Sequence, residues 1–334
     1  MVFVGCSAPT CSRSTKPPDP VVAPPVPTAV ASAVASAEEG PKQQEPMSAA
    51  MSEVSDYIDH LRRGGRRSIH YVEPQEREEH AFTEWVAAVA RGAQKDTEPT
   101  VNPPSGFVLQ RFQGGMWLLS EGQQRRGAGA VVIRIGPAAP MLVEAPHTFF
   151  DSGTLPIALA VFERQHARAL LVNTAHRYVA RLGKEPEQNA REEDSTASIS
   201  DVAHTKRSFF LAAHNALLAV DPGAWTVQLH GFQDASAKGV DVILSASVTN
   251  ADTTPVAREL GDLLGAASVR TYPDEIKVLG ALTNIQAESS KRAGAPFLHI
   301  EMSRSLRDKL VADTTLRSRF AAAIAPVRRA DLER

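Results

Sequence analysis

The chain has 334 residues, enough for one large α/β domain with a tail or for two average domains. Its hydrophobic content of 43% and charged content of 22% are typical of globular proteins. The formal net charge of −2 argues against a nucleic-acid partner, which would leave a basic footprint. No apolar run in the sequence approaches the length that crosses a bilayer.

The first residues are similar to the end of a bacterial lipoprotein signal. In such signals a small residue, here Gly5, precedes a cysteine that becomes lipidated, here Cys6. Only five residues precede Cys6, without the basic and apolar regions of a complete signal. Two alternatives follow, an exported, lipid-anchored protein or an unprocessed leader. The first places the protein in the cell envelope, with Cys6 as its only membrane contact, and the second in the cytoplasm.

A stretch rich in Pro, Ala, Ser and Glu follows from residue 13 to about residue 51. It has few bulky apolar residues to offset the entropy of ordering, so we expect a disordered linker. Residues 1–51 thus form the expected leader and linker, and residues 52–330 a single α/β domain. Because Cys6 and Cys11 are the 2 cysteines of the chain, this domain contains neither a disulfide nor a cysteine-based zinc site.

Beyond residue 52 the sequence alternates between helical and extended patterns. A helix is expected over residues 74–93, where Phe82, Trp85 and Val89 recur at helical spacing after an acidic first turn. Further helices are expected over residues 154–165, 204–220, 255–264, 305–311 and 316–323. Strands are expected over residues 106–112, 116–120, 130–135, 141–144, 169–173, 225–230, 241–245, 268–272 and 296–301.

The segments between these elements are polar or glycine-rich. Gly114-Gly115 indicates a hairpin turn, residues 184–198 indicate a charged surface loop, and residues 283–286 indicate a connecting or substrate loop. The alternation as a whole predicts an α/β fold, a three-layer sandwich with a mixed, mostly parallel sheet. No Gly-x-Ser-x-Gly elbow, Walker loop or Rossmann glycine fingerprint is present, which disfavours serine hydrolases, kinases and dehydrogenases.

Polar, ligand-type residues stand at the ends of three predicted strands. One run ends on His147, a second on His230 and a third on Glu301. Since α/β sheets hold their active sites at the carboxyl edge, we expect these side chains to meet. Two imidazoles and a carboxylate, with one position left for water, are typical ligands of a catalytic zinc ion. Asp151, four residues after His147, would complete the set, and Glu301 would be the general base.

The carboxylate ligand has alternatives. Asp151 could instead cap the helix that begins near Thr154. Glu144 could also coordinate the ion, although it lies inside its strand. Gly231, which follows His230, would permit close backbone geometry beside an ion.

A second group of residues concerns the substrate. Arg177 follows a predicted buried strand, so we expect it at the same edge, as a further catalytic residue that clamps a substrate carboxylate. Asn173 ends that strand and His204 opens the next helix, whose N-terminus attracts anions. We expect both residues, and Arg304 after the last strand, to contact the substrate. Arg307 could do the same or form a surface salt bridge.

Three short segments resemble the metal and base motifs of the N-formylglutamate amidohydrolase-like group. They are residues 144–147 (Glu-Ala-Pro-His), 228–231 (Gln-Leu-His-Gly) and 299–303 (His-Ile-Glu-Met-Ser). Zinc carboxypeptidases and N-acetylmuramoyl-L-alanine amidases share this phosphorylase/hydrolase-like architecture, in which two histidines and an acid hold a metal and a late glutamate is the catalytic carboxylate. The resemblance spans residues 129–323 and implies His147 and His230 as ligands and Glu301 as the base.

The chain departs from this group at two points. In carboxypeptidases the acidic ligand stands three residues after the first histidine, where this chain has Phe150. The amidases carry a glycine-rich stretch after the first histidine, which is absent here. The sequence therefore leaves the identity of the carboxylate ligand open.

Taken together, the residues predict a zinc-dependent hydrolase of an amide or peptide bond, in which Glu301 activates the zinc-bound water. The substrate would be a small amide or peptide that carries a carboxylate, and a cell-wall peptide if the leader is a lipid anchor. The alternative is a non-catalytic ligand-binding lipoprotein on a hydrolase scaffold. A phosphorylase-type enzyme of the same architecture would need an additional anion pocket.

Overall fold

The computed structural model describes residues 48–63, 70–123, 125–180, 198–246, 248–249 and 251–324. The chain divides into the units Met1–Gly40 and Pro41–Arg334, and every described residue belongs to the second unit. The leader with Cys6, up to residue 47, and the loop predicted over residues 184–198, up to residue 197, lie outside the described residues. Among the helices of the described part, none is long and apolar enough to cross a membrane.

A nine-stranded mixed sheet runs through the described residues, in the order β1-β2-β3-β5-β4-β6-β9-β7-β8. Its centre is parallel, formed by β5, β4, β6 and β9. Strands β1 to β3 form an antiparallel meander on one side, and β7 pairs antiparallel with β9 on the other. The strands are β1 (Phe107–Phe112), β2 (Met116–Glu121), β3 (Ala130–Arg134), β4 (Ala139–Ala145), β5 (Ala167–Val172), β6 (Trp225–Phe232), β7 (Val242–Ser245), β8 (Val269–Tyr272) and β9 (Phe297–Ser303).

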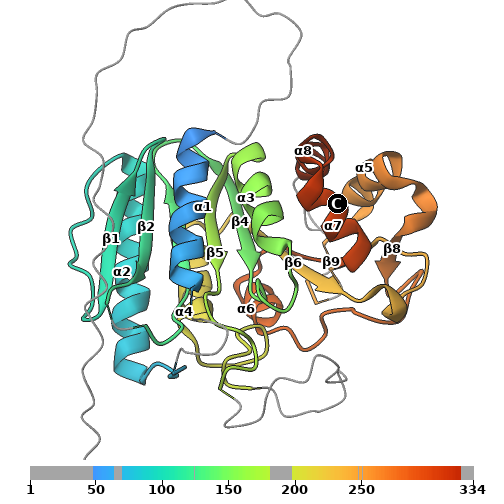
Figure 1. The fold of residues 1–334 in the computed structure, drawn as a ribbon. Helices are drawn as coiled ribbons and strands as arrows, with labels where there is room; N and C mark the ends of the chain where they lie inside the picture. The colour runs from blue at the N-terminus through green and yellow to red at the C-terminus, as the bar shows by residue number, and fades with distance from the viewer. Residues whose placement is uncertain are drawn as a thin grey trace, which may run out of the picture. The chain divides into compact units, whose positions relative to one another are not determined.

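Helices cover both faces of this sheet (Figure 1). On one face, a single apolar core joins the sheet to α1 (Ala49–Arg62), α3 (Thr154–Arg164), α5 (Thr254–Leu264), α7 (Arg304–Ala312) and α8 (Thr314–Ala323). On the other face, a second core joins the sheet to α2 (Glu76–Lys95) and α4 (Phe209–Val220), and α6 (Ile285–Ala293) packs beside α4. The predicted α/β sandwich with a mixed sheet is therefore confirmed. Its parallel pairs lie among the four central strands and between β7 and β8 at one edge.

Several predicted boundaries were wrong for reasons that concern capping. Helix α1 begins at Ala49, before residue 52, because the Ser48 hydroxyl accepts a hydrogen bond from the Met51 N–H and caps it. Helix α4 begins at Phe209 and not at His204, since Ser208 caps it through the Leu211 N–H. The loop predicted over residues 283–286 ends earlier than expected, because Asn284 caps α6 through the Ala287 N–H and the helix begins at Ile285.

The hairpin prediction was correct. Gly114 and Gly115 join β1 to β2 with φ values of 74° and 70°. Positive φ at both central residues is the geometry whose twist matches two paired strands, and glycine adopts it without steric cost.

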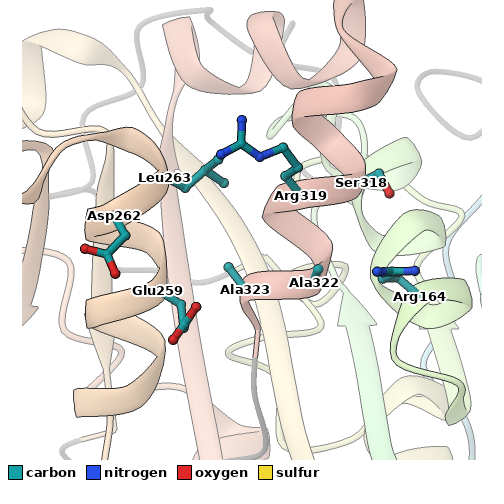
Figure 2. A pocket seen from close by; sticks show the side chains of 8 residues that line it. All are labelled: Arg164, Glu259, Asp262, Leu263, Ser318, Arg319, Ala322 and Ala323. Atoms are coloured by element: carbon teal, nitrogen blue, oxygen red, sulfur yellow. The ribbon is translucent and has the colours of Figure 1, made fainter. Parts of the chain in front are cut away.

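A surface groove of about 350 Å³ lies among α3, α5 and α8 (Figure 2). Side chains of both charges line it, so it has no single electrostatic preference. None of its lining residues is a predicted site residue. The lining residues are Arg164, Glu259, Asp262, Leu263, Ser318, Arg319, Ala322 and Ala323.

Candidate metal centre

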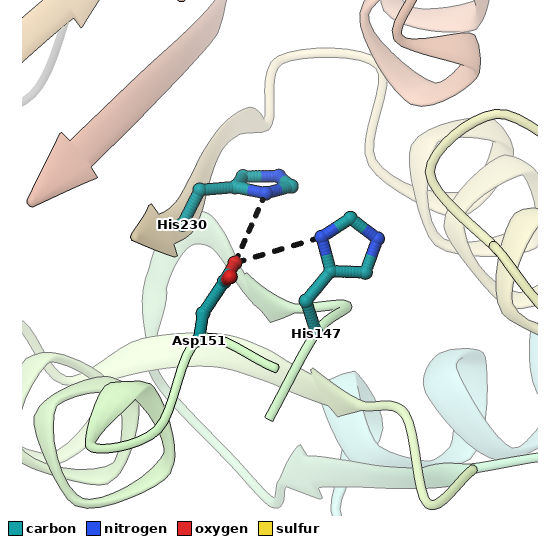
Figure 3. A group of neighbouring side chains, drawn as sticks. All are labelled: His147, Asp151 and His230. Carbon is teal, nitrogen blue, oxygen red and sulfur yellow. Dashed lines mark ion pairs between the residues drawn. The ribbon is translucent and has the colours of Figure 1, made fainter. Parts of the chain in front are cut away.

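Three of the predicted ligand residues converge at the carboxyl edge of the parallel strands (Figure 3). His147 follows β4, Asp151 lies in the turn four residues later, and His230 lies near the end of β6. The Nδ1 atoms of both histidines lie 3.5 Å from the same oxygen, Asp151 Oδ2. All three side chains are buried. The chain thus brings together two imidazoles and one carboxylate from segments that are far apart in the sequence.

The side chain of Asp151 does not cap α3. The N-cap of that helix is Gly153, and no side chain makes a capping hydrogen bond there. The backbone carbonyl of Asp151 accepts from Thr154 instead, which leaves the carboxylate directed at the histidines. Of the two roles considered for Asp151, helix cap or ligand, the geometry therefore supports the role of a ligand.

Each histidine also contacts a buried polar group through its Nε2 atom. His147 Nε2 lies 2.8 Å from Asp201 Oδ1, and His230 Nε2 lies 2.6 Å from Gln228 Oε1. Asp201 can only accept, so the His147 Nε2 atom carries a proton and its Nδ1 atom presents a lone pair. Metal-binding histidines in proteins are usually oriented in this way by a partner on the second ring nitrogen.

The electrostatics of the cluster follow from burial and from these partners. Burial lowers the pKa of His230 to about 4, so this imidazole is neutral at pH 7. Burial also opposes the charged form of His147, but the carboxylates of Asp201 and Asp151 outweigh it and raise its pKa. Burial would raise the pKa of Asp151, yet the two histidines beside its carboxylate hold it well below its ordinary range. The Asp151 carboxylate is therefore ionised.

These residues fit a tetrahedral metal ion. With Zn–N and Zn–O bonds of about 2.0–2.1 Å, two ligand atoms of a tetrahedral site lie ~3.3–3.4 Å apart. The two separations of 3.5 Å to Asp151 Oδ2 are close to that value. In addition, His147 Nδ1 is buried without a hydrogen-bond partner in the described part of the chain, as expected for an atom that donates its lone pair to an ion. The cluster can hold a metal ion through Nδ1, Nδ1 and one carboxylate oxygen.

Glu301 lies beside this cluster on the neighbouring strand. It pairs with His230 in the parallel register of β6 and β9, and both strands continue two residues beyond the predicted ends. His299, two residues earlier on the same face of β9, stacks 4.5 Å from the His230 ring. His230, His299 and Glu301 form a second group of close ligand-type atoms. Burial and the nearby His230 lower the pKa of His299 well below its ordinary value.

Arg177 reaches the centre indirectly. Its Nε and Nη2 atoms donate to Asp201 Oδ2 over 2.9 and 2.5 Å, so the guanidinium supports the carboxylate that orients His147. The same guanidinium lies over the rings of Phe150 and Tyr178. Arg177 therefore belongs to the centre by position, while its contact with a substrate stays a prediction.

The residues predicted for substrate binding contact other parts of the chain. Burial lowers the pKa of His204, and the charges of Asp201 and His147 also act on it, so His204 lies near the metal ligands. The side-chain amide of Asn173 is hydrogen-bonded to the backbone, since Nδ2 donates to the Pro146 carbonyl and Oδ1 accepts from the Ala175 N–H. His204 lies against the Thr283 carbonyl, four residues before the cap of α4. Arg304 is exposed and pairs with Asp308 on its own helix. Their substrate roles remain predictions.

Arg307 and Gly231 have structural roles that differ from the predicted ones. Arg307 is 1% exposed, so it is neither a surface salt bridge nor a substrate clamp. Its guanidinium donates to the carbonyls of Ser152, Phe232 and Met302. A Cβ atom at position 231 would overlap that guanidinium, so Gly231 makes room for Arg307 and not for an ion.

Sequence reasoning missed three polar residues of this region. Asp201, Gln228 and His299 were not predicted as site residues, although Gln228 and His299 stand two residues before His230 and Glu301. Because strand side chains alternate, that spacing places each pair on one face and was a usable signal. Glu144 is not a ligand, since its carboxylate contacts His214 and Gln228.

No family model matches the chain, and no curated protein matches it. The chain is similar to several solved structures. The chain is 15% identical to N-formylglutamate amidohydrolase from Ralstonia eutropha JMP134, with 58% of this chain and 97% of that chain covered and a TM-score of 0.36. It is 15% identical to a bacteriophage poly-gamma-glutamate hydrolase, with 59% and 86% covered and a TM-score of 0.38.

A third similar structure is a metallo-carboxypeptidase from Burkholderia cenocepacia. It is 14% identical, with 76% of this chain and 70% of that chain covered and a TM-score of 0.37. The solved structures to which the chain is similar thus include an amidohydrolase and a metallo-carboxypeptidase, at low identity. Likenesses this distant do not decide the activity, which has to be argued from the site itself.

Proposed function

We propose that the protein is a zinc-dependent hydrolase of an amide or peptide bond. His147, Asp151 and His230 would hold the zinc ion, and Glu301 would be the general base. The observation that carries this proposal is the meeting of two histidine Nδ1 atoms at one carboxylate oxygen. When bound, a zinc ion would polarise the scissile carbonyl and lower the pKa of a water molecule.

The position of Glu301 supports its role in proton transfer. It is the parallel-register neighbour of His230 and is 8% exposed, more than the 2% of His147 and Asp151. A carboxylate at this place can take a proton from an attacking water molecule and later return it to the leaving amine. Arg177 would act through Asp201, whose carboxylate it neutralises in part.

The substrate in this proposal is a small amide or peptide. Arg304, at the exposed start of α7 three residues after Glu301, is the guanidinium best placed to meet a substrate carboxylate from solvent. Lipidation of Cys6 belongs to the same proposal. It would place the enzyme in the cell envelope, where cell-wall peptides are available.

The test combines metal content with turnover. Purified protein should contain zinc, and His147→Ala with His230→Ala should remove it while the fold persists by circular dichroism. Glu301→Gln should lower turnover of a peptide or N-acyl amino acid library by about 10²-fold or more, as loss of a general base does, and keep the metal. Glu121→Gln is the matched control, because that buried carboxylate contacts the backbone N–H groups of residues 126–128 and the Arg126 side chain, away from the candidate ligands.

Two results would contradict the proposal. One is a folded wild-type protein that takes up no zinc. The other is a zinc-loaded wild-type protein that binds the candidate substrates but turns over none of them, with an affinity that Glu301→Gln leaves unchanged. That result would identify a non-catalytic binding protein.

A further inference from the structure

A chain of buried polar side chains runs from His230 into the interior. Gln228 on β6 and Glu144 on β4 are both 0% exposed, and Gln228 Nε2 donates to Glu144 Oε2 over 2.8 Å. The second oxygen of Glu144 lies 2.8 Å from His214 Nδ1 on α4. On the other side, Gln228 Oε1 faces His230 Nε2 at 2.6 Å. None of Glu144, Gln228 and His214 has a role in the proposed hydrolysis.

The orientation of the Gln228 amide decides where His230 carries its proton. Amide oxygen and nitrogen atoms are interchangeable in shape, so their assignment has to come from their partners. A flipped amide would present an N–H group to His230 and would require the proton on the other ring nitrogen. The lone pair of His230 would then point away from Asp151.

Groups with fixed polarity settle this orientation. The backbone N–H of Ala287 can only donate, so it holds Asn284 Oδ1 and turns Asn284 Nδ2 toward Gln228, at 2.5 Å from Oε1. The backbone carbonyl of Val202 can only accept, so it holds Gln286 Nε2 and turns Gln286 Oε1 toward Gln228 Nε2. The side chains of Asn284 and Gln286, held in this way, both require the oxygen of Gln228 to face His230.

We infer that Gln228 is a positioning residue that fixes the proton of His230 on Nε2 and presents its Nδ1 lone pair to the space beside Asp151. Asn284, Gln286 and Glu144 hold the Gln228 amide in that orientation. The part of this inference that concerns metal affinity rests on the proposed function, while the position of the proton does not. Since His230 then has one lone pair, the groups His147–Asp151–His230 and His230–His299–Glu301 cannot both use it at the same time.

The proton position is measurable in the metal-free full-length protein. Nitrogen-15 spectra of histidine-labelled protein distinguish Nε2–H from Nδ1–H imidazoles, and His230→Gln identifies the His230 signals. The wild type should show His230 with its proton on Nε2. A His230 proton on Nδ1 in the wild type overturns the inference without any further variant.

Two matched variants separate positioning from general packing. Gln228→Met removes the acceptor beside His230, and Thr226→Val alters an equally buried residue on the same strand, whose hydroxyl has no hydrogen-bond partner in the described part of the chain. Gln228→Met should mix the two tautomers of His230 and weaken zinc binding, measured by calorimetry, about 10–100-fold, as loss of a ligand's outer partner does. Thr226→Val should leave the dominant tautomer and the zinc affinity close to those of the wild type.

Equal effects of the two variants on the tautomer and on zinc binding would overturn the inference, because they would reflect packing alone. Failure of the proposed function looks different. In that case wild-type protein binds no zinc, and the His230 proton is still found on Nε2. A zinc-binding wild type with an unchanged His230 signal in Gln228→Met overturns only the positioning role.

Discussion

Replacing Arg307 by methionine should destabilise the domain and loosen the candidate metal centre at the same time. The Arg307 guanidinium is buried in α7 and donates to the carbonyl oxygen of Ser152 over 2.5 Å and to that of Phe232 over 3.2 Å. Ser152 follows Asp151 directly, and Phe232 lies two residues after His230. One side chain therefore ties together the two segments that carry these candidate ligands.

The size of the effect follows from the three hydrogen bonds to carbonyl oxygens that methionine would remove. A hydrogen bond to a charged donor contributes about 1.5–3 kcal/mol, and only the bond to Ser152 is short. The bonds to Phe232 and Met302 measure 3.2 and 3.3 Å, so they belong at the lower end. We expect a loss of about 5 kcal/mol, a large part of the 5–15 kcal/mol that holds a typical domain.

Thermal unfolding followed by circular dichroism measures this loss. For a domain of this size about 5 kcal/mol corresponds to a fall in Tm of roughly 10–20 °C. Arg304→Met is the control, since Arg304 lies on the same helix but is exposed and pairs only with Asp308, and it should change stability by no more than about 0.5 kcal/mol. Equal shifts for both variants, or a fall below about 2 °C for Arg307→Met, would refute the reasoning.

Three further predictions use the same region. Gly231→Ala should cost about 1–3 kcal/mol in urea unfolding, because its methyl group would overlap Arg307, whereas Gly223→Ala meets only an ordinary contact and should be near neutral. Asp201→Asn should weaken zinc binding about 10–100-fold in calorimetry, since His147 loses its carboxylate partner, and an unchanged affinity would contradict this. Zinc at 100 times its Kd should stabilise the protein by about 2.7 kcal/mol and EDTA should reverse this, so a Tm insensitive to both would exclude a zinc site.

The parts of the fold that could be predicted are those with a local signal. The strands near His147, His230 and Glu301 are apolar runs that end on polar residues, and parallel strands bring their carboxyl ends to one edge. The convergence of His147 and His230 therefore follows from their places on β4 and β6. The role of Asp151 did not follow, because a residue near a helix start is as well suited to a cap as to a ligand.

The parts that could not be predicted depend on contacts between distant segments. Nothing near Arg307 in the sequence shows that its guanidinium is surrounded by carbonyls from the turn after Asp151 and from the end of β6. Helix α6 was missed because its sequence is mostly polar, and its position depends on the Asn284 cap and on packing against α4. Tertiary contacts determine the structure of such segments, and local propensity predicts it only weakly.

The charges of the buried centre favour a cation as its occupant. Asp151, Asp201 and Glu301 bring three carboxylates, and Arg177 and Arg307 bring two guanidinium groups, so with neutral imidazoles these five groups sum to −1. Buried charges are costly unless they are compensated, and a cation offsets this negative sum. Burial opposes the charged form of His147, but the carboxylates of Asp201 and Asp151 raise its pKa, so protons compete with a metal ion for this imidazole. Zinc affinity should therefore fall as the pH falls, and calorimetry in buffers of different ionisation enthalpy should detect protons released on binding.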